Sequence, residues 1–461
     1  MSSIYVDAIA GHSWRHFGFD AHITYYLDNG GARAWRPAEK AAFAAACQAW
    51  ANVANITFEE ADEINVFGRF EERLVTTASF PPVGGSVTAA THEVPGPIEL
   101  AYGEFASDGN AAHPSILGYH DPKPGSAAFE TFLQEIGHGL GLAHPHDTGQ
   151  GTTVFPGLTP DGKGGFDPFS LGTGNMNQEI VTLMSYNDSF LASPLSGHVA
   201  GPMAVDIAAI QKLYGINHAY HSDDDTYALD DLVTAGHARW LCIWDGGGHD
   251  TISYSGARAV DIDLRPATLQ PGFGAAGYYS QLTGNKIGGY TIANGARIEN
   301  AVGGRGGDTL IGNKVANHLD GNGGRDTIYG GLGRDVIDGG AGADKLSGGS
   351  GNDIFRFDRA ADSGPRAGRF DTIQDFTHRH DKLDFSAIDA SAALADDQAF
   401  HFISGGKFSG VAGQLHFVLT HAADPSHDST MIEGDINGDR IADFRVQLDG
   451  IVHLTAADFI L

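Results

Sequence analysis

A cluster of histidine and glutamate residues has the spacing of a metal centre with its own general base. It lies in the stretch Gln134-Glu135-Ile136-Gly137-His138-Gly139-Leu140-Gly141-Leu142-Ala143-His144. Residues four apart on an α-helix share one face, so positions 134 and 138 are directed at the same point. Gly141 suits a sharp turn that would bring His144 back toward the same point. Glu135 would then stand beside a bound metal as general base on water.

A second pattern is a nine-residue repeat of glycine, aspartate and one large apolar residue. Six consecutive nonamers cover residues 303–356, and they are GGRGGDTLI, GNKVANHLD, GNGGRDTIY, GGLGRDVID, GGAGADKLS and GGSGNDIFR. The first six residues suit a tight turn, because glycine adopts positive φ at no steric cost. The last three suit a short strand whose central residue points inward: Leu310, Leu319, Ile328, Ile337, Leu346 and Phe355. A flexible linker would not keep this spacing, so the repeat predicts a parallel β-roll that cages Ca²⁺ with oxygen ligands.

The elements that must position these residues change in character near residue 240. The histidine cluster falls on a helix predicted from about Gly125 to Leu142. Other elements predicted before residue 240 are strands at 23–27, 56–58 and 64–67, a helix over 38–53 that starts at Pro37, mostly loop over 78–125, and a helix over 203–214 that ends at Gly215. Helical periodicity then disappears. We therefore expect an α+β domain over residues 1–240 and an all-β parallel β-roll over residues 241–461.

Composition excludes several classes of function. The chain has 461 residues, with 28 basic against 57 acidic side chains and a net charge of −29. Such a surface repels nucleic acid and anionic membranes and attracts divalent cations. No run reaches the roughly 18 apolar residues that a membrane span needs. Cys47 and Cys242 are the only cysteines, and the sequence does not decide whether they pair.

The nonamers resemble the glycine- and aspartate-rich repeats of RTX proteins. Their sixth positions are Asp308, Asn317, Asp326, Asp335, Asp344 and Asp353. The resemblance implies calcium sites built from turns two apart, with the pairs Asp308 and Asp326, Asp326 and Asp344, and Asp335 and Asp353. The site that shares Asn317 should be weaker, because an amide brings no charge. Calcium would then stabilise the fold in place of disulfides.

The histidine stretch resembles the metzincin pattern H-E-x-x-H-x-x-G-x-x-H, and its surroundings resemble the serralysin family. Met184-Ser185-Tyr186 is similar to the serralysin Met-turn, in which the methionine underlies the metal. Residues 206–215 are similar to the helix that closes the family's catalytic domain, and the similarity extends through residues 263–266 and 298–301. The resemblance implies a metzincin-like zinc endopeptidase domain followed by the roll. It also implies that Tyr186 is a switchable metal ligand that supports the oxyanion.

The pattern departs from the family at position 134, where Gln134 stands in place of the first histidine. An amide oxygen is a poor zinc ligand beside imidazole, and changes even behind the ligands cost zinc sites roughly 10–100-fold in affinity. Three outcomes stay open. Zinc binds through His138, His144 and Tyr186, with Gln134 or water completing the site. Alternatively, His146 or His120 substitutes for the missing ligand, or the site is empty and the protein is a pseudoprotease that binds its partners in a calcium-dependent manner.

Three further acidic clusters resemble calcium loops of the same family. Asp245 and Asp250 precede the roll in one cluster. The second follows the roll and holds Asp371, Asp375, Asp381 and Asp384, and the third, near the end of the chain, holds Asp435, Asp439 and Asp443. Each is interpreted as a candidate calcium site.

Both ends of the chain bear on where the protein is expected to act. Residues 1–7 contain neither a basic nor an apolar region of a cleaved signal peptide. The C-terminal residues Asp458-Phe459-Ile460-Leu461 resemble the uncleaved signal that type I exporters recognise. We therefore expect an extracellular monomer that is exported by a type I system and cleaves protein or peptide substrates. A purely structural or adhesive RTX module would leave Glu135, His138, His144, Met184 and Tyr186 unexplained.

Overall fold

A five-stranded sheet organises the N-terminal part of the computed structural model. The structure describes residues 3–17, 20–31, 33–62, 70–75, 82–83, 86–87, 90–92, 101–106, 122–148, 152–187, 198–232, 238–272, 274–284, 288–391 and 397–461. The strand order is β2-β1-β3-β7-β6, and every neighbouring pair is parallel except β7 and β6. The strands are β1 (His22–Asp28), β2 (Thr57–Glu60), β3 (Phe70–Val75), β6 (Ala90–His92) and β7 (Ala101–Ala106).

The prediction that residues 78–125 are mostly loop was wrong for its middle part. β7 pairs with β3 along its whole length, and a small hairpin is formed by β4 (Pro82–Val83) and β5 (Ser86–Val87). The Pro- and Gly-rich composition concealed strands whose pairing partner lies elsewhere in the chain. The strand predicted at 64–67 lies outside the described residues.

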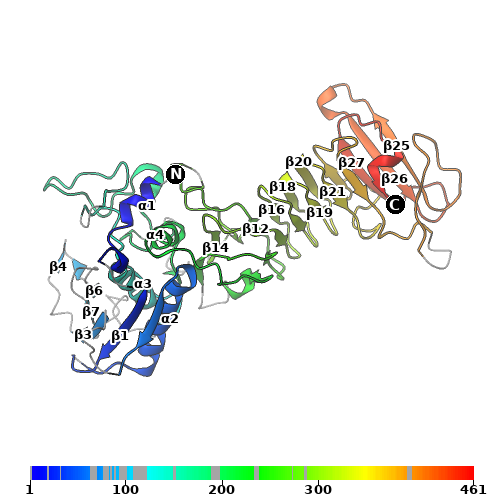
Figure 1. The fold of residues 1–461 in the computed structure, drawn as a ribbon. Helices are drawn as coiled ribbons and strands as arrows, with labels where there is room; N and C mark the ends of the chain where they lie inside the picture. The colour runs from blue at the N-terminus through cyan, green and yellow to red at the C-terminus, as the bar shows by residue number, and fades with distance from the viewer. Residues whose placement is uncertain are drawn as a thin grey trace.

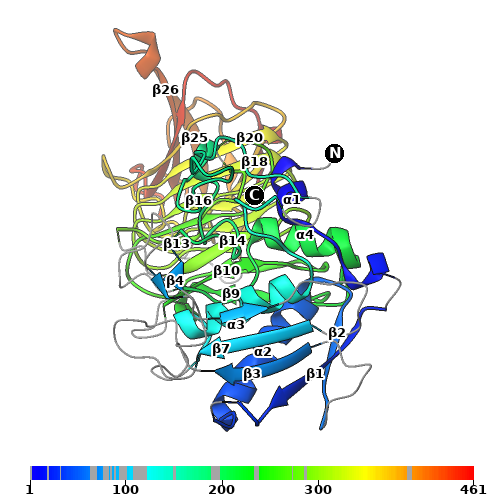
Figure 2. The same cartoon turned by 90° about the vertical axis from the view of Figure 1, so that its left-hand side faces the viewer.

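Within the described residues, four α-helices accompany the sheet, and Figure 2 shows α2 and α3 beside its strands. They are α1 (Ile4–Ile9), α2 (Pro37–Val53), α3 (Ala127–Gly139) and α4 (Ala204–Tyr214), with a 3-10 turn η1 at Trp14–Phe17. The start of α2 at Pro37 and the end of α4 before Gly215 confirm the predictions for these two helices. α3 is shorter than predicted at both ends. Ser126 caps its first turn by accepting from the Phe129 N–H, and Gly141, with φ of 102°, turns the chain away.

The repeats form a roll of two sheets in which the repeat strands pair in parallel, and the roll extends away from the N-terminal part (Figure 1). The parallel roll predicted for residues 241–461 is wrong for residues 414–449, whose strands pair antiparallel. One sheet has the order β28-β23-β21-β19-β17-β15-β11-β9, with strands β9 (Thr226–Ala228), β11 (Thr251–Ser253), β15 (Asn300–Val302), β17 (His318–Asp320), β19 (Val336–Asp338), β21 (Ile354–Arg356), β23 (Lys382–Asp384) and β28 (Phe459–Ile460). The other has the order β13-β12-β16-β18-β20-β22-β27-β26-β25-β24, with strands β12 (Val260–Asp263), β13 (Gln281–Leu282), β16 (Thr309–Ile311), β18 (Thr327–Gly333), β20 (Lys345–Gly351), β22 (Asp371–Ile373), β24 (His401–Phe402), β25 (Gln414–Thr420), β26 (Ser429–Asp435) and β27 (Phe444–Asp449).

Successive nonamers alternate between these two sheets, so that residues two repeats apart become neighbours. Leu310 aligns with Ile328 in one sheet, and Leu319 aligns with Ile337 in the other. All six residues predicted to point inward are fully buried. The thin apolar core of the roll is therefore the one that the repeat predicted.

The N-terminal part and the roll are joined by a three-stranded sheet of β8 (His198–Val199), β10 (Arg239–Ile243) and β14 (Gly289–Ile292). The first strand of the roll, β9, already lies before residue 241. Cys47 and Cys242 are both buried free thiols, so they form no disulfide. None of the helices in the described part of the chain combines the length and the apolar character that a membrane crossing requires.

Candidate functional site

Two histidines and a tyrosine meet at the end of α3. α3 carries His138, and the turn after Gly141 returns His144 beside it, with 4.3 Å between the centres of the two rings. Tyr186 lies against the other side of His144, where its Oη is 2.8 Å from the Nε2 atom of that imidazole. The structure therefore brings together three residues that the sequence predicted to converge.

The backbone holds both imidazoles in a fixed orientation. The Nδ1 atom of His138 lies 2.8 Å from the Leu142 carbonyl oxygen, and that of His144 lies 2.7 Å from the Met184 carbonyl oxygen. A carbonyl oxygen only accepts, so each Nδ1 carries the proton and each Nε2 keeps its lone pair, which in His144 accepts from the Tyr186 hydroxyl. Such hydrogen bonds fix the tautomer and the ring orientation in zinc sites.

The electrostatics of the site keep both imidazoles neutral. Burial lowers the pKa of His138 to about 3 and that of His144 to about 4, with further lowering from the neighbouring imidazole in each case. Both rings are therefore unprotonated at neutral pH, as metal binding requires. Burial also raises the pKa of Glu135 to about 8, which brings this carboxylate close to the range of an effective general base.

Met184 lies beneath the helix, as the Met-turn resemblance implies. A Cβ atom on Gly137 would stand 3.0 Å from the Met184 sulfur and 3.0 Å from the Trp50 ring, so a larger residue would push these neighbours away from the helix. The turn is held by Asp206 at the start of α4. Its fully buried carboxylate accepts from the Thr182 hydroxyl at 2.6 Å and from the Leu183 and Met203 N–H groups at 2.7 and 2.9 Å.

Replacing Asp206 with alanine is expected to lower the free energy of unfolding by about 3 kcal/mol, because three buried donors would lose their acceptor. Urea unfolding followed by tryptophan fluorescence measures this loss. The exposed Asp161 provides the control, since Asp161→Ala removes a carboxylate whose partners are solvated backbone groups. A loss below about 1 kcal/mol for Asp206→Ala would show that this carboxylate does not hold the Met-turn.

Gln134 is half-buried, and its amide forms no hydrogen bond with any residue that the structure describes. His146 stacks on His144 with 5.1 Å between ring centres and an angle of 15° between the ring planes. Two nearly parallel stacked rings cannot both direct a lone pair at one ion, so this conformation does not make His146 a substitute ligand. His120, the other histidine considered, lies outside the described residues.

Sequence reasoning missed a buried ion pair behind Glu135. His92 on β6 and Glu72 on β3 are fully buried side chains, with 3.0 Å between His92 Nε2 and Glu72 Oε1. The pair packs on Gly139, where a Cβ atom would lie 2.6 Å from the His92 ring. No local pattern could have found it, because its members come from two strands of which one was predicted as loop.

The sixth-position side chains of the repeats form a ladder along the roll. The backbone N–H of each one donates to the Oδ1 of the residue two turns on, as between Asp308 and Asp326 at 2.7 Å and between Asp335 and Asp353 at 3.0 Å. The pairs that the resemblance implied are therefore neighbours. The ladder continues beyond the nonamers, because the Asp344 N–H donates to the Asp371 carboxylate.

The second carboxylate oxygen of many ladder residues is buried without a hydrogen-bond partner. These residues are Asp326, Asp335, Asp344, Asp353 and Asp371. Burial, with the neighbouring carboxylates, raises the pKa of Asp326 and Asp344 to about 8. Orphaned, crowded carboxylate oxygens are what a hard cation with six to eight oxygen ligands would satisfy, so the residues present fit Ca²⁺. Asp308 differs, because both of its oxygens accept from backbone N–H groups.

The other acidic clusters divide into different structural roles. Asp245 and Asp250 converge with Asp225, which the sequence analysis missed, and their ligand atoms lie within 4.8 Å of one another. Asp371 and Asp381 extend the ladder instead of forming a separate loop, and Asp381 accepts from the Asp353 N–H. Asp375 reaches back to the last nonamer, where it accepts from the Gly348 and Gly349 N–H groups. The remaining residues close local turns: Asp384 on Ser386, Asp435 on Gly438 and Arg440, Asp439 on Ile441, and Asp443 on Ile436 and Asn437.

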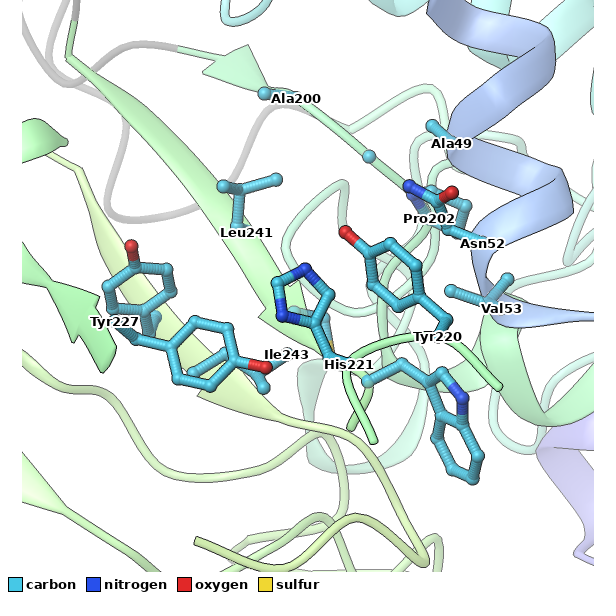
Figure 3. A pocket seen from close by; sticks show the side chains of 14 residues that line it. Ala49, Asn52, Val53, Ala200, Pro202, Tyr220, His221, Tyr227, Leu241 and Ile243 are labelled. Atoms are coloured by element: carbon cyan, nitrogen blue, oxygen red, sulfur yellow. The ribbon is translucent and has the colours of Figure 1, made fainter. Parts of the chain in front are cut away.

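A cavity of about 310 Å³ lies at the junction of α2, β10 and the loop that carries Tyr220 and His221 (Figure 3). None of the residues predicted to bind zinc lines it. The cavity borders the cluster of Asp225, Asp245 and Asp250. Tyr227 lines the cavity, and its hydroxyl donates to Asp245 at 2.6 Å. The cavity is therefore separate from the histidine site.

Comparison with known proteins identifies the family. A family model described as the C-terminal part of the M10 serralysin peptidases matches residues 204–461. The metallopeptidase AprA of Pseudomonas marginalis is 35% identical over 431 residues, which cover 89% of this chain and 78% of that protein. Serralysin C of Dickeya chrysanthemi is 34% identical over 441 residues, covering 90% and 78%. Among solved structures, the AlgE6R3 subunit of the Azotobacter vinelandii mannuronan C5-epimerase is 29% identical, covers 34% of this chain and 78% of that one, and has a TM-score of 0.26. The chain belongs to the serralysin family of M10 peptidases, as its sequence motifs indicated.

Proposed function

We propose that this chain is a secreted, calcium-stabilised zinc endopeptidase whose activity is weakened by Gln134. Residues 1–240 would form the metzincin-like catalytic domain and residues 241–461 the β-roll with the export region. The relatives named above are a metallopeptidase and a serralysin, and this supports a protease. The single observation that carries the proposal is the convergence of the His138 and His144 imidazoles, both in the ligand tautomer, with the Tyr186 hydroxyl.

The chain's own residues have separable roles in this proposal. His138, His144 and Tyr186 would hold zinc, which when bound supplies Lewis acidity toward water and a substrate carbonyl. Glu135 would take the proton of the attacking water, for which its raised pKa suits it, and deliver it to the leaving amine. Tyr186 is 47% exposed, so its hydroxyl can leave the Nε2 of His144 and donate to the developing oxyanion.

Calcium and export would be linked through the roll. Within the cell, where free calcium is scarce, the acidic ladder would lack its cation and the chain would stay threadable through a type I exporter. Outside the cell, calcium would neutralise the orphaned carboxylates and fold the roll. The protein would act as a monomer on protein or peptide substrates.

Gln134 favours one alternative, in which the protein is a catalytically inactive pseudoprotease that acts as a calcium-dependent extracellular binding protein. In that case the histidine pair would hold too little zinc for hydrolysis, and the scaffold would serve to bind peptides.

Elemental analysis of zinc and a casein-hydrolysis assay distinguish the two functions. We expect the natural chain to bind zinc and to hydrolyse casein slowly. Glu135→Gln should keep the zinc and lose at least about 100-fold in rate, since it removes only the base. His144→Ala should lose both. A natural chain without zinc and without hydrolysis would establish the pseudoprotease instead.

A further inference from the structure

A second group of metal-ligating side chains lies one helical turn before Gln134. Glu130 comes from α3, Glu179 from the segment that leads into the Met-turn, and His198 from β8. One ligand atom from each residue lies within 4.8 Å of the other two. None of these residues belongs to the histidine site, and the sequence patterns pointed to none of them.

The distances within this group suit a first-row divalent cation. The Nδ1 atom of His198 is 2.7 Å from Glu130 Oε2 and 3.6 Å from Glu179 Oε1. Ligands around a tetrahedral zinc ion are separated by roughly 3.4 Å, given metal–ligand bonds near 2.1 Å. Small adjustments would therefore admit an ion. The imidazole nitrogen favours zinc over calcium, which takes oxygen ligands.

The three side chains are held in place, and one side of the group stays open. Glu179 is only 7% exposed and its Oε1 accepts from the Val199 N–H at 3.0 Å, which fixes the carboxylate. The side chain of His198 is 40% exposed, so an ion could enter from solvent and keep a water as fourth ligand.

Protons occupy this group in the absence of metal. Burial and then Glu179 raise the pKa of Glu130 to about 8, while hydrogen bonds to Glu130 and then Glu179 raise the pKa of His198 to about 10. At neutral pH a protonated imidazole thus bridges two crowded carboxyl groups. A divalent cation would replace these protons and neutralise both carboxylates.

We propose that Glu130, Glu179 and His198 form a second zinc site, which clasps the helix of the histidine motif to the Met-turn segment and to β8. The site is independent of the proposed hydrolytic function, because it needs neither Gln134 nor the pair His138 and His144.

Zinc titration in a His138→Ala/His144→Ala background, with Ca²⁺ in excess to fill the acidic ladder, isolates this site. We expect about one zinc per chain, and we expect binding to weaken more than 100-fold when His198→Ala is added, because a direct ligand is lost. Calorimetry in two buffers of different ionisation enthalpy should show proton release at neutral pH. Zinc should also raise the melting temperature of the background protein, but not that of the His198→Ala variant.

The matched control is His22→Ala, which removes a histidine that contacts a single exposed glutamate, Glu59, at 3.1 Å. Zinc binding should be unchanged in this variant. Circular dichroism in Ca²⁺ alone verifies that each variant is folded. If the double-alanine background does not fold, Co²⁺ absorption in the otherwise natural chain replaces it, and His198→Ala should lower the number of bound ions by one. Absence of zinc binding in the folded background, or binding that survives His198→Ala, would show that the group is only an ion pair.

Discussion

Replacing Gln134 with histidine is expected to raise zinc affinity and casein hydrolysis by about 100-fold or more. Position 134 lies one helical turn before His138 on the same face of α3, so the new imidazole would join two whose Nε2 atoms already carry a lone pair. The half-buried Gln134 amide forms no hydrogen bond with a described residue that the change would break. Competition of the protein with a chelator for zinc measures the affinity, and initial rates of casein hydrolysis measure the activity.

The control for this change is Gln134→Asn, which keeps an amide and adds no imidazole. We expect Gln134→Asn to resemble the natural chain in both measurements. If the natural chain is inactive and Gln134→His is active, the natural protein is a pseudoprotease with an otherwise intact site. If Gln134→His neither binds zinc more tightly nor hydrolyses casein faster, the missing ligand is not what limits the site, and the assignment of residue 134 to the metal face is wrong.

The parts of the fold and of the site that sequence predicted are those specified by local, repeated patterns. Each nonamer has an apolar residue at its eighth position, and this regular spacing alone identifies the buried row that includes Leu310 and Phe355. The histidine stretch combines helix periodicity with Gly141, so the return of His144 follows from residues that are close in sequence. The start of α2 at Pro37 was likewise predictable from helix-capping preferences.

What could not be predicted depends on residues that are distant in sequence. The sheet edge formed by β6 and β7 exists because β3 offers a partner, and the composition of that segment suggested loop. The buried pair of His92 and Glu72 depends on that same edge. Asp225 joins Asp245 and Asp250 only when β9 and β11 pair. In each case the signal is tertiary contact, which overrides local propensity.

Removing calcium is expected to unfold the roll. Three sites filled at 100 times their dissociation constants would together contribute about 8 kcal/mol, which is comparable to the whole stability of a typical domain at about 5–15 kcal/mol. Without the cation, the buried Oδ2 atoms of residues such as Asp335 and Asp353 have no hydrogen-bond partner. Far-UV circular dichroism and thermal melting in excess chelator should show loss of β-structure at neutral pH, and added calcium should restore it. An unchanged melting temperature would contradict calcium binding by the ladder.

The pH dependence of the calcium-free roll should run opposite to that of the calcium-loaded protein. Burial raises the pKa of Asp326 to about 8 and that of Asp335 to about 7, above the value near 4 of an unfolded aspartate. A group whose pKa is raised by folding stabilises the fold fully below its unfolded pKa, and the contribution disappears as pH rises through the folded pKa. In chelator, the roll should therefore be most stable near pH 4 and lose stability progressively between about pH 4 and 8. With calcium, acidification should instead release the ion, because calcium binds the ionised carboxylates.

The ladder already contains one amide, and its hydrogen bonds show that the charge of a sixth-position side chain can be removed while its contacts are kept. Asn317 occupies a sixth position, and it accepts from the Asn313 N–H at 2.8 Å and donates to the Glu299 carbonyl oxygen at 2.9 Å. Asp326→Asn and Asp335→Asn should therefore fit the ladder as the protonated acids do. We expect the double variant to stay folded in chelator at pH 8, where the natural chain unfolds, and to bind calcium more weakly. If the variant instead unfolds with the natural chain, carboxylate repulsion is not what calcium relieves, and the ladder would owe its stability to packing alone.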